Sequence, residues 1–261
     1  MATDPRPVSE LDQPVKSLKT TIRILEAVES LDEPGVTDIA DELDVAKSTV
    51  FDHLKTLESN EFVVKTDGNS YRIGLRFLDF GGRVRSELEL YRIAEEEVAK
   101  LADETGELVN LVVEEHGLGV YIDYVRGADA INLDTYVGKR EHLHNTAFGK
   151  AMLAYMPESR VDEILERHGL PPETGKTVTS RSELEDRLDR VKERGFAVDR
   201  EERLDGLRCV AAPIMGEGSS VLGAVSLSGP TSRLQDDRLM NELADEVKRT
   251  ANIIEINLTY S

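Results

Sequence analysis

Residues 36–57 read VTDIADELDVAKSTVFDHLKTL, and this stretch predicts two helices joined by a tight turn at Asp44-Val45-Ala46. We expect Thr37 to cap the first helix, because a threonine hydroxyl accepts a hydrogen bond from the free N–H groups of a first turn. The second helix presents one apolar stripe, formed by Val50, Leu54 and Leu57. Two helices connected in this way form either a helix-turn-helix or an ordinary helical hairpin.

The face of the second helix opposite its apolar stripe carries small polar and basic side chains. With about 100° between successive residues, Ser48, Asp52 and Lys55 point away from the stripe. Lys47 and Phe51 flank them. Such a face suits a helix that enters the major groove of DNA, although a solvated helix surface has a similar composition. This stretch alone leaves both interpretations open.

The segments on either side of this stretch favour DNA binding. Residues 62–65 (FVVK) and 71–73 (YRI) are separated by a turn that contains Asp67-Gly68, which predicts a β-hairpin. Upstream, residues 17–31 predict a third helix, whose inward face would hold Leu18, Ile22, Leu25 and Val28. Three helices followed by a hairpin form a winged helix, so this order indicates a DNA-binding domain.

The net charge of −19 over 261 residues opposes this interpretation, because nucleic-acid-binding domains are usually basic. The negative charge is unevenly distributed, since residues 45–76 contain 5 Lys and Arg against 4 Asp and Glu. We interpret the acidic body as adaptation to a salt-rich cytoplasm, as in a halophilic archaeon, where carboxylates keep a protein soluble. Salt there also removes most of the counterion-release contribution to DNA affinity. The alternative is an acidic mesophilic protein.

Other bulk features indicate a cytoplasmic protein. The single Cys excludes an internal disulfide framework and fits a reducing compartment. Residues 1–14 are polar, lack a secretory signal and predict a mobile N-terminal tail. The longest apolar runs, such as residues 108–113, are too short to span a membrane, so we expect no membrane partner.

Beyond a winged helix at residues 15–74, the sequence predicts a linker helix at 75–89 and a second domain at 90–261. The pair Gly81-Gly82 predicts a kink or break in the linker helix, and its apolar residues predict packing against a partner subunit. We expect strands at residues 108–114, 120–126, 131–137, 196–199, 207–215 and 221–228, and helices at residues 90–105, 146–155 and 235–258. Two further helices would begin near Pro157 and at a capping box of Ser182 with Glu185. This mixed order indicates an α+β fold class, with the second domain built around an antiparallel sheet.

Several polar residues of the second domain are candidates for one shared binding site. A helix start at residues 146–150 offers N–H groups that attract a carboxylate or carbonyl group. Ser226 and Ser228 lie two apart on a predicted strand, so their hydroxyls face the same side of a sheet. Asp199 at a strand end and Cys209 would complete a polar site. On spacing alone, the simpler interpretation is surface serines, a solvated aspartate and a small core cysteine.

A catalytic interpretation has less support. Cys209 and His144 would form a thiol–imidazole pair, and His142 with His144 and either Cys209 or Asp199 a metal site, only if the fold brought them together. The sequence contains no phosphate-binding loop, dinucleotide fingerprint, nucleophile elbow or zinc-protease motif. We therefore expect no catalytic residue, no bound metal and no cofactor.

From about Pro14 onward, the sequence resembles the IclR (isocitrate-lyase regulator) family of transcription regulators. The resemblance rests on Asp38–Ala40, Lys47–Val50, Tyr71–Arg76, Gly149–Ala154, Arg194–Phe196, Gly206–Pro213 and Ala224–Pro230. It implies an N-terminal winged helix, a linker helix and a C-terminal effector domain similar to GAF domains, in a homodimer or a dimer of dimers. It also implies regulation by a small metabolite, for which we expect a sugar, a sugar acid or a small organic acid.

The resemblance places the family's effector pocket on Ala147, Phe148, Asp199, Cys209, Ser226 and Ser228, beside the helix start at Thr146, and this favours the shared site. Two residues depart from the family's pattern. Phe148 stands where many relatives have a smaller residue, so we expect a smaller or reshaped pocket. Asp52 replaces a residue that is often basic, and there it would repel a phosphate or accept a hydrogen bond from a cytosine amino group.

We therefore predict a homodimeric, ligand-responsive transcription regulator rather than an enzyme. The residues expected near DNA are Thr37, Lys47, Ser48, Thr49, Phe51, Asp52 and Lys55 on the helices and Lys65 and Arg72 on the wing. Two-fold symmetry implies a pseudo-palindromic operator in double-stranded DNA. Two alternatives stay open, a regulator whose GAF-like domain only dimerises and an enzyme domain with an appended winged helix.

Overall fold

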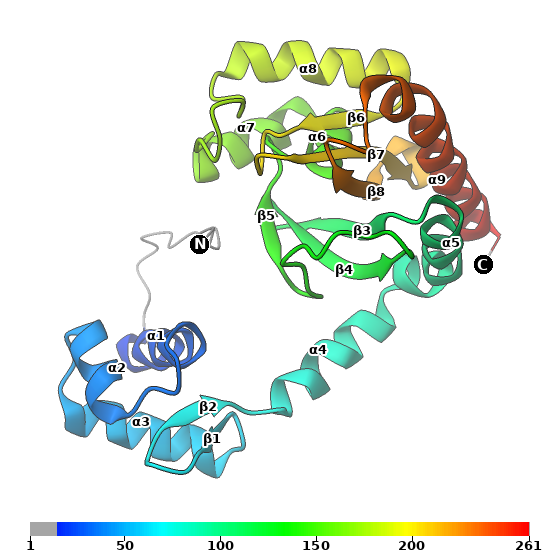
Figure 1. The fold of residues 1–261 in the computed structure, drawn as a ribbon. Helices are drawn as coiled ribbons and strands as arrows, with labels where there is room; N and C mark the ends of the chain where they lie inside the picture. Colours follow the sequence, from blue (N-terminus) through cyan, green and yellow to red (C-terminus); the bar gives the residue numbers. More distant parts are fainter. Residues whose placement is uncertain (1–14, 261) are drawn as a thin grey trace. The chain divides into compact units, whose positions relative to one another are not determined.

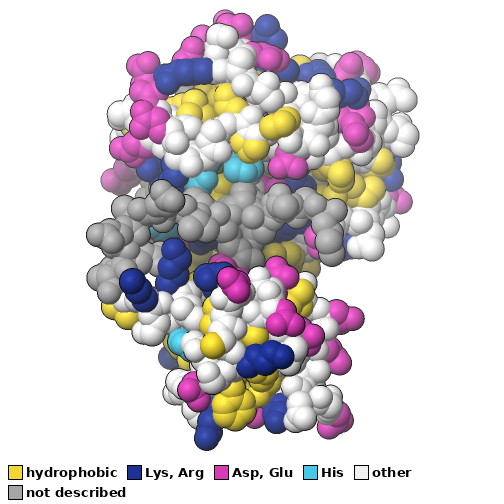
Figure 2. All heavy atoms as spheres, turned by 90° about the vertical axis from the view of Figure 1, so that its left-hand side faces the viewer, with side chains coloured by type: hydrophobic (Ala, Val, Ile, Leu, Met, Phe, Trp, Pro, Cys, Tyr) yellow, Lys and Arg dark blue, Asp and Glu magenta, His cyan; other side chains and the backbone are white. Residues whose placement is uncertain are grey.

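The computed structural model describes residues 15–260, so the tail predicted at residues 1–14 lies outside the described residues. The chain forms two compact units, an N-terminal unit that ends at Arg85 and a C-terminal unit that continues from Ser86 (Figure 1). Across the described range, no helix is both long and apolar enough to cross a bilayer. On the face shown in Figure 2, acidic side chains occur on both units, and lysines and arginines are interspersed among them.

The N-terminal unit is a winged helix, as the sequence predicts. It comprises α1 (Lys16–Ser30), α2 (Val36–Leu43), α3 (Lys47–Ser59), β1 (Val63–Lys65) and β2 (Tyr71–Ile73). Asp44 adopts a left-handed conformation with φ 51°, which forms the tight turn between α2 and α3. The three helices share one core, at whose centre Ile24, Ile39, Val50 and Leu54 are fully buried.

Two predicted details of this unit are wrong. α1 buries Ile24, Ala27 and Val28, whereas Leu18 and Ile22 are 57% and 47% exposed. The reason is that α1 carries apolar side chains on more than one face, and packing against α2 and α3 selects only one of them. Thr37 does not cap α2, because the helix already begins at Val36 and the Asp38 carboxylate accepts the N–H of Gly35 at 2.8 Å.

The predicted kink at Gly81-Gly82 is also wrong. The helix α4 (Arg76–Glu87) runs through both glycines without interruption, because glycine weakens a helix but does not force it to end. The helical path is broken instead at Leu88, whose extended conformation with ψ 113° separates α4 from α5 (Glu89–Thr105). α5 then ends, as predicted, at Gly106 in a left-handed conformation with φ 72°.

Within residues 86–260, six strands form one antiparallel sheet in the order β5-β4-β3-β8-β7-β6 (Figure 1). The strands are β3 (Leu108–Glu115), β4 (Leu118–Arg126), β5 (Arg140–His142), β6 (Ala197–Arg200), β7 (Leu207–Met215) and β8 (Val221–Pro230). α5 and α9 (Leu243–Thr259) cover one face of the sheet, and α6 (Ala147–Leu153) packs against the other. α8 (Arg181–Arg194) contacts α6, and α7 (Glu158–His168) joins the same core.

The two faces of the sheet differ in chemistry, because successive residues of a strand point to opposite sides. In β8, Val225 and Leu227 belong to the apolar core formed with α5 and α9. The intervening Ser226 and Ser228 lie on the other face, which also carries Cys209. The central strands therefore present small and polar side chains toward α6.

Two predictions in the C-terminal unit are corrected. Residues 131–137 form a loop, not a strand, although Leu133 is buried and Arg126 donates to its carbonyl oxygen at 3.2 Å. The alternating apolar pattern of these residues thus belongs to a loop that packs on the core, and the edge strand beside β4 is β5. α8 begins earlier than predicted, and its cap is Ser180, which accepts the N–H of Glu183 at 3.4 Å, instead of Ser182.

Candidate functional site

Most residues that we expected to contact DNA lie on the exposed surface of α3. The side chains of Lys47, Ser48, Asp52 and Lys55 are exposed, Thr49 is half-buried, and Thr37 is exposed on α2. Phe51 is 47% exposed, although it is a large apolar residue in a well-packed helix. An exposed aromatic side chain beside lysines suits apolar contact with base methyl groups in a DNA groove.

Two polar contacts join the three helices, one between α1 and α3 and one between α1 and the end of α2. His53 Nδ1 lies 2.8 Å from Thr21 Oγ1 of α1, and the guanidinium of Arg23 donates to the carbonyl oxygen of Leu43 at the end of α2 at 3.0 Å. Together with the buried Val50, Leu54 and Leu57, these contacts hold the exposed face of α3 at a defined angle. The sequence analysis missed both contacts, because they join residues of different helices.

The structure does not bring the two predicted wing cations together. Val64 pairs with Arg72 and Lys65 pairs with Tyr71 in the hairpin, so Lys65 and Arg72 lie on opposite faces of it. Both side chains are exposed. Arg72 lies beside the start of α4, where it shares a surface groove with Leu75 and Asp79.

The predicted effector residues of the C-terminal unit do meet on the face of the sheet that α6 covers. Asp199 pairs with Cys209, Cys209 pairs with Ser228, and Ser226 pairs across β8 and β3 with Asn110. All four predicted residues are less than 10% exposed. The interpretation of these residues as a solvated aspartate and surface serines is therefore wrong.

Asn110 is a central residue of this site that the sequence analysis missed. Its side-chain amide donates to Ser226 Oγ at 3.3 Å and to Ser228 Oγ at 3.4 Å. Its Oδ1 atom is buried and has no hydrogen-bond partner within residues 15–260. An asparagine in the middle of the apolar strand 108–113 was the available signal, because a buried amide requires partners.

Asp199 is the candidate ligand-binding carboxylate of the site. Its Oδ1 accepts the backbone N–H of Glu202 at 2.7 Å, whereas its buried Oδ2 finds no partner in the described part of the chain. Burial raises the pKa of Asp199 to about 6, and the positive charge of Lys150 limits the rise. Asp199 is thus ready to accept a hydrogen bond from a ligand at neutral pH.

The start of α6 supports the site structurally. Thr146 caps the helix by accepting the N–H of Gly149 at 3.2 Å, and its hydroxyl donates to the carbonyl oxygen of His142 at 3.0 Å. A side chain at Gly149 would meet the Leu143 carbonyl oxygen at 2.1 Å, so only glycine allows this close approach. The Thr146 hydroxyl is therefore engaged in holding α6, next to the buried Ala147.

Phe148 is buried at the start of α6, where it packs against β4. Its ring packs edge-on against Tyr121 with 5.4 Å between centroids. A Cβ atom at Gly119 would lie 2.4 Å from the Phe148 ring, so the absent side chain of Gly119 makes room for it. Phe148 and Gly119 thus form a matched pair, which the sequence analysis missed because they lie on different elements.

Arg203 and Glu141 form an ion pair near Tyr121. Arg203 donates to Glu141 Oε1 at 2.5 Å, and both side chains are 11% exposed. The charge of Arg203 also acts on Asp199 and Cys209. The sequence analysis predicted neither residue. Arg203 follows β6 and Glu141 belongs to β5, so their contact joins residues that are 62 apart in the sequence.

The residues considered for catalysis make other contacts. Burial raises the pKa of Cys209 well above its ordinary value, although the neighbouring Ser228 limits the rise. His144 lies 3.1 Å from the carbonyl oxygen of Pro171, and burial lowers its pKa to about 4. In residues 15–260, no group of three or more His, Cys, Asp or Glu is placed to hold a metal ion. The described residues therefore form neither a hydrogen-bonded pair of Cys209 and His144 nor a metal site that includes His142 and His144.

Comparison with known proteins agrees with this geometry. Residues 17–67 match the IclR helix-turn-helix domain, and residues 82–256 match the family described as bacterial transcriptional regulator IclR C-terminal. A relative from Halobacterium salinarum, the probable HTH-type transcriptional regulator ArcR, is 30% identical over 249 residues, which cover 94% of each chain.

Solved structures share the fold along almost the whole chain. The Thermotoga maritima IclR structure matches with a TM-score of 0.77 and 31% identity, covering 94% of this chain and 99% of that one. An IclR homolog from Microbacterium hydrocarbonoxydans, solved in complex with 4-hydroxybenzoate, matches with a TM-score of 0.80 at 21% identity, covering 94% of this chain and all of that one. The two family matches, in this order along the chain, show that the protein belongs to the IclR family and is a DNA-binding transcription regulator.

Proposed function

We propose that a small metabolite, bound between α6 and the polar face of the sheet, controls the operator binding of this regulator. The observation that carries the proposal is a pair of buried atoms, Asn110 Oδ1 and Asp199 Oδ2, without hydrogen-bond partners among the described residues. Unpaired buried polar atoms cost stability, and a bound ligand is one way to complete their hydrogen bonds. The relative solved with 4-hydroxybenzoate supports a small organic ligand in this fold.

The polar groups of the site define the chemistry of such a ligand. Asn110 Oδ1 and the Asp199 carboxylate accept hydrogen bonds, so the ligand presents hydroxyl or N–H groups to them. Arg203 pairs with Glu141 near Asp199, and the guanidinium N–H groups that this pair leaves would donate to a ligand carboxylate. A sugar, a sugar acid or a small hydroxylated organic acid has these features. Tyr121 and Phe148 restrict the ligand to a compact molecule.

The same proposal assigns DNA contacts to the exposed face of α3. Lys47, Ser48, Phe51 and Lys55 would lie in the major groove, with Thr37 and Thr49 near the backbone. Asp52 would accept a hydrogen bond from a cytosine amino group. Because Lys65 and Arg72 lie on opposite faces of the hairpin, they would contact phosphates at two separate places.

We also propose a homodimer joined through α4, with a dimer of dimers as the larger assembly. No residue of α4, all of which the structure describes, is buried. Leu78 and Val84 of α4 and the preceding Leu75 are 69%, 62% and 71% exposed, and large apolar side chains left exposed along one segment indicate a protein contact. A second copy of the chain would pair the same segment about a two-fold axis, which requires a pseudo-palindromic operator.

The acidic surface supports the proposal that the protein works in a salt-rich cytoplasm. The net charge of −19 is spread over both units, and the relative ArcR comes from Halobacterium salinarum. Unfolding at low salt that concentrated KCl reverses is the expected behaviour, and a protein that is equally stable in dilute buffer would contradict it.

The effector proposal is tested by a thermal-shift screen of sugars, sugar acids and small organic acids, followed by operator binding in concentrated KCl. An effector should raise Tm and change operator affinity by roughly fivefold or more. The double variant Ser226→Ala/Ser228→Ala should keep operator binding and lose the response, because it removes both hydroxyls that Asn110 contacts. Ser182→Ala on the exposed surface of α8 is the control and should respond normally.

The two alternatives predict different outcomes of this screen. A domain that only dimerises gives no ligand-dependent shift with any compound, while truncation of residues 86–261 abolishes dimers. An enzyme domain converts a hit compound into a product, which mass spectrometry detects. Either outcome would overturn the effector proposal.

A further inference from the structure

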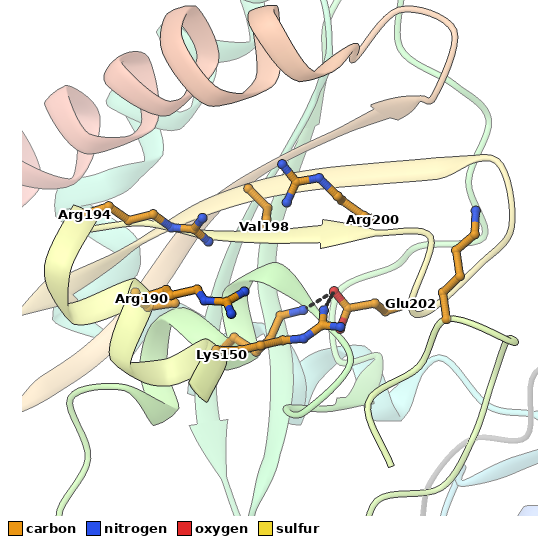
Figure 3. Close-up of a pocket in the computed structure, with 9 residues that line it drawn as sticks. Lys150, Arg190, Arg194, Val198, Arg200 and Glu202 are labelled. Carbon is orange, nitrogen blue, oxygen red and sulfur yellow. Dashed lines mark hydrogen bonds and ion pairs between the residues drawn. The ribbon is translucent and has the colours of Figure 1, made fainter. Parts of the chain in front are cut away.

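A pocket of about 340 Å³, apart from the proposed effector site, lies between α8 and the edge strand β6 (Figure 3). This volume falls at the lower end of the range of small-molecule sites. Among the residues that line it, six are cationic and one, Glu202, is acidic; the cations are Lys150, Lys176, Arg187, Arg190, Arg194 and Arg200. None of the seven residues proposed to bind the effector lines it. In a chain with a net charge of −19, this concentration of positive charge is a local exception.

Part of this positive charge is not neutralised by the protein. Lys176 contacts Glu201 at 2.5 Å, and Arg200 contacts Asp236 at 3.2 Å. In contrast, Arg190 makes no hydrogen bond or ion pair to another residue of the 15–260 range. Arg194 donates only to the carbonyl oxygen of Phe196, at 2.6 Å, within that range.

The unpaired guanidinium groups repel one another. Burial lowers the pKa of Arg194, and the charges of Arg200 and Arg190 lower it further. In Figure 3, Arg190, Arg194 and Arg200 extend toward the same space from α8 and β6. Guanidinium groups gathered in this way bind phosphate or carboxylate groups through paired hydrogen bonds.

Glu202 determines a second property of a molecule that binds in this pocket, besides its negative charge. Its Oε1 contacts Lys150 at 2.5 Å and Arg187 at 2.9 Å at the base of the pocket. Its Oε2 is buried and lacks a hydrogen-bond partner among the described residues, and the side chain is 1% exposed. An ionised carboxylate oxygen accepts but does not donate, so a molecule that completes this contact carries a hydroxyl or N–H group.

We propose that this pocket is a second ligand site, which binds a small hydroxylated dianion of the sugar-phosphate class. The phosphate group contacts Arg190 and Arg194, and a sugar hydroxyl donates to Glu202 Oε2. The site does not depend on the effector proposal, because its lining residues are different. The two sites still share one segment, since the backbone N–H of Glu202 bonds to Asp199 Oδ1 at 2.7 Å.

The test is calorimetric titration of the full-length protein with glucose 6-phosphate at constant KCl concentration. Glucose, inorganic phosphate and citrate are the comparison probes. Glucose 6-phosphate should bind at least tenfold more tightly than each of them, and Arg190→Gln should weaken it about tenfold or more, as expected for the loss of a charged hydrogen bond. Arg181→Gln removes the same charge from α8 outside the pocket and should change the affinity less than twofold.

The double variant Ser226→Ala/Ser228→Ala separates this site from the effector site, and it should retain glucose 6-phosphate binding. Four results would overturn the proposal. The first is the absence of binding at millimolar concentration, and the second is an equal loss in Arg190→Gln and Arg181→Gln, which indicates a diffuse charge effect. The third is equal affinity for inorganic phosphate or tighter binding of citrate, and the fourth is loss of binding in the double serine variant.

Discussion

The N-terminal and C-terminal units hold their candidate functional residues in opposite environments. On α3, the residues proposed to contact DNA are mostly exposed and follow one another along a single helix. In the C-terminal unit, the residues proposed to bind the effector are buried and come from β3, β6, β7, β8 and α6. Surface substitutions change the free energy of unfolding by about 0.5 kcal/mol or less, whereas loss of a buried polar partner costs more.

This difference has a consequence for function. DNA affinity can vary in the N-terminal unit without a change in stability, because the contacting side chains do not hold the fold together. In the C-terminal unit, ligand binding and folding depend on the same buried groups. Four substitutions test this contrast, in order of decreasing effect, and Phe148→Ala serves as the buried reference for the last of them.

Glu202→Ala should have the largest effect. Lys150 is 2% exposed and contacts Glu202 at 2.5 Å, and burial already lowers the pKa of Lys150. Removal of the carboxylate leaves a buried ammonium group without this partner, which should cost about 3–5 kcal/mol of the free energy of unfolding. Denaturant unfolding in concentrated KCl measures this loss.

The matched control is the double variant Lys150→Met/Glu202→Leu. It removes both charges of the buried pair and replaces them with apolar side chains, so most of the lost stability should return. A loss below about 1 kcal/mol in Glu202→Ala would contradict the contrast between the two units.

Asp199→Asn should change how stability depends on pH. The folded protein binds the Asp199 proton more tightly than the unfolded chain, because burial raises the pKa from an ordinary value of 3.8 to about 6. The contribution of this group to the free energy of unfolding is therefore present at low pH and falls by about 2 kcal/mol as the pH rises from 4 to 7. The variant lacks this equilibrium and should gain about 2 kcal/mol relative to the wild type over the same range.

His144 acts in the opposite direction but does not obscure this measurement. Burial lowers its pKa to about 4 from 6.5, so its stabilising contribution is present above pH 6.5 and is lost as the pH falls toward 4. Both proteins contain His144, and its effect cancels in their difference. Asp186→Asn, at an exposed position of α8, is the control and should leave the pH profile of unfolding unchanged.

The same contrast explains which residues the sequence could predict. The stripe of Val50, Leu54 and Leu57 depends on neighbours within four residues, and the hairpin after it pairs residues within ten, so local periodicity and the turn were sufficient. The inward face of α1 depends on which helices pack against it, and there the prediction failed for Leu18 and Ile22.

The effector site depended on information that local periodicity lacks. The pairing of Asn110 with Ser226 joins strands that are more than a hundred residues apart in sequence. Spacing favoured surface positions for the serines, and only the resemblance to the IclR family grouped them with Asp199 and Cys209. Neither the spacing nor the family resemblance pointed to Arg203 and Glu141, because their contact depends on the arrangement of β5 and β6 in the fold.

Lys55→Glu should act on DNA affinity alone. The side chain is exposed on α3, and reversal of its charge should weaken binding to operator and non-operator DNA by about tenfold at moderate salt. The free energy of unfolding should stay within about 0.5 kcal/mol of the wild type. Fluorescence anisotropy with labelled duplexes measures the affinity, and Lys192→Glu on α8 is the charge-matched control. Equal binding by Lys55→Glu and wild type would remove this face of α3 from the DNA interface.

Phe51→Ala should have the smallest effect, and it compares the two units most directly because Phe148 is the same residue type in the opposite environment. Phe51 is 47% exposed and Phe148 is 4% exposed. Phe148→Ala removes the ring contact with Tyr121 and should cost about 3–5 kcal/mol of the free energy of unfolding. Phe51→Ala should cost about 0.5 kcal/mol or less and weaken operator binding about threefold to tenfold, with the largest loss at sites that place a thymine methyl group against it. If Phe51→Ala instead unfolded the protein as readily as Phe148→Ala, Phe51 would be a structural residue, and the apolar contact proposed for α3 would have to come from another side chain.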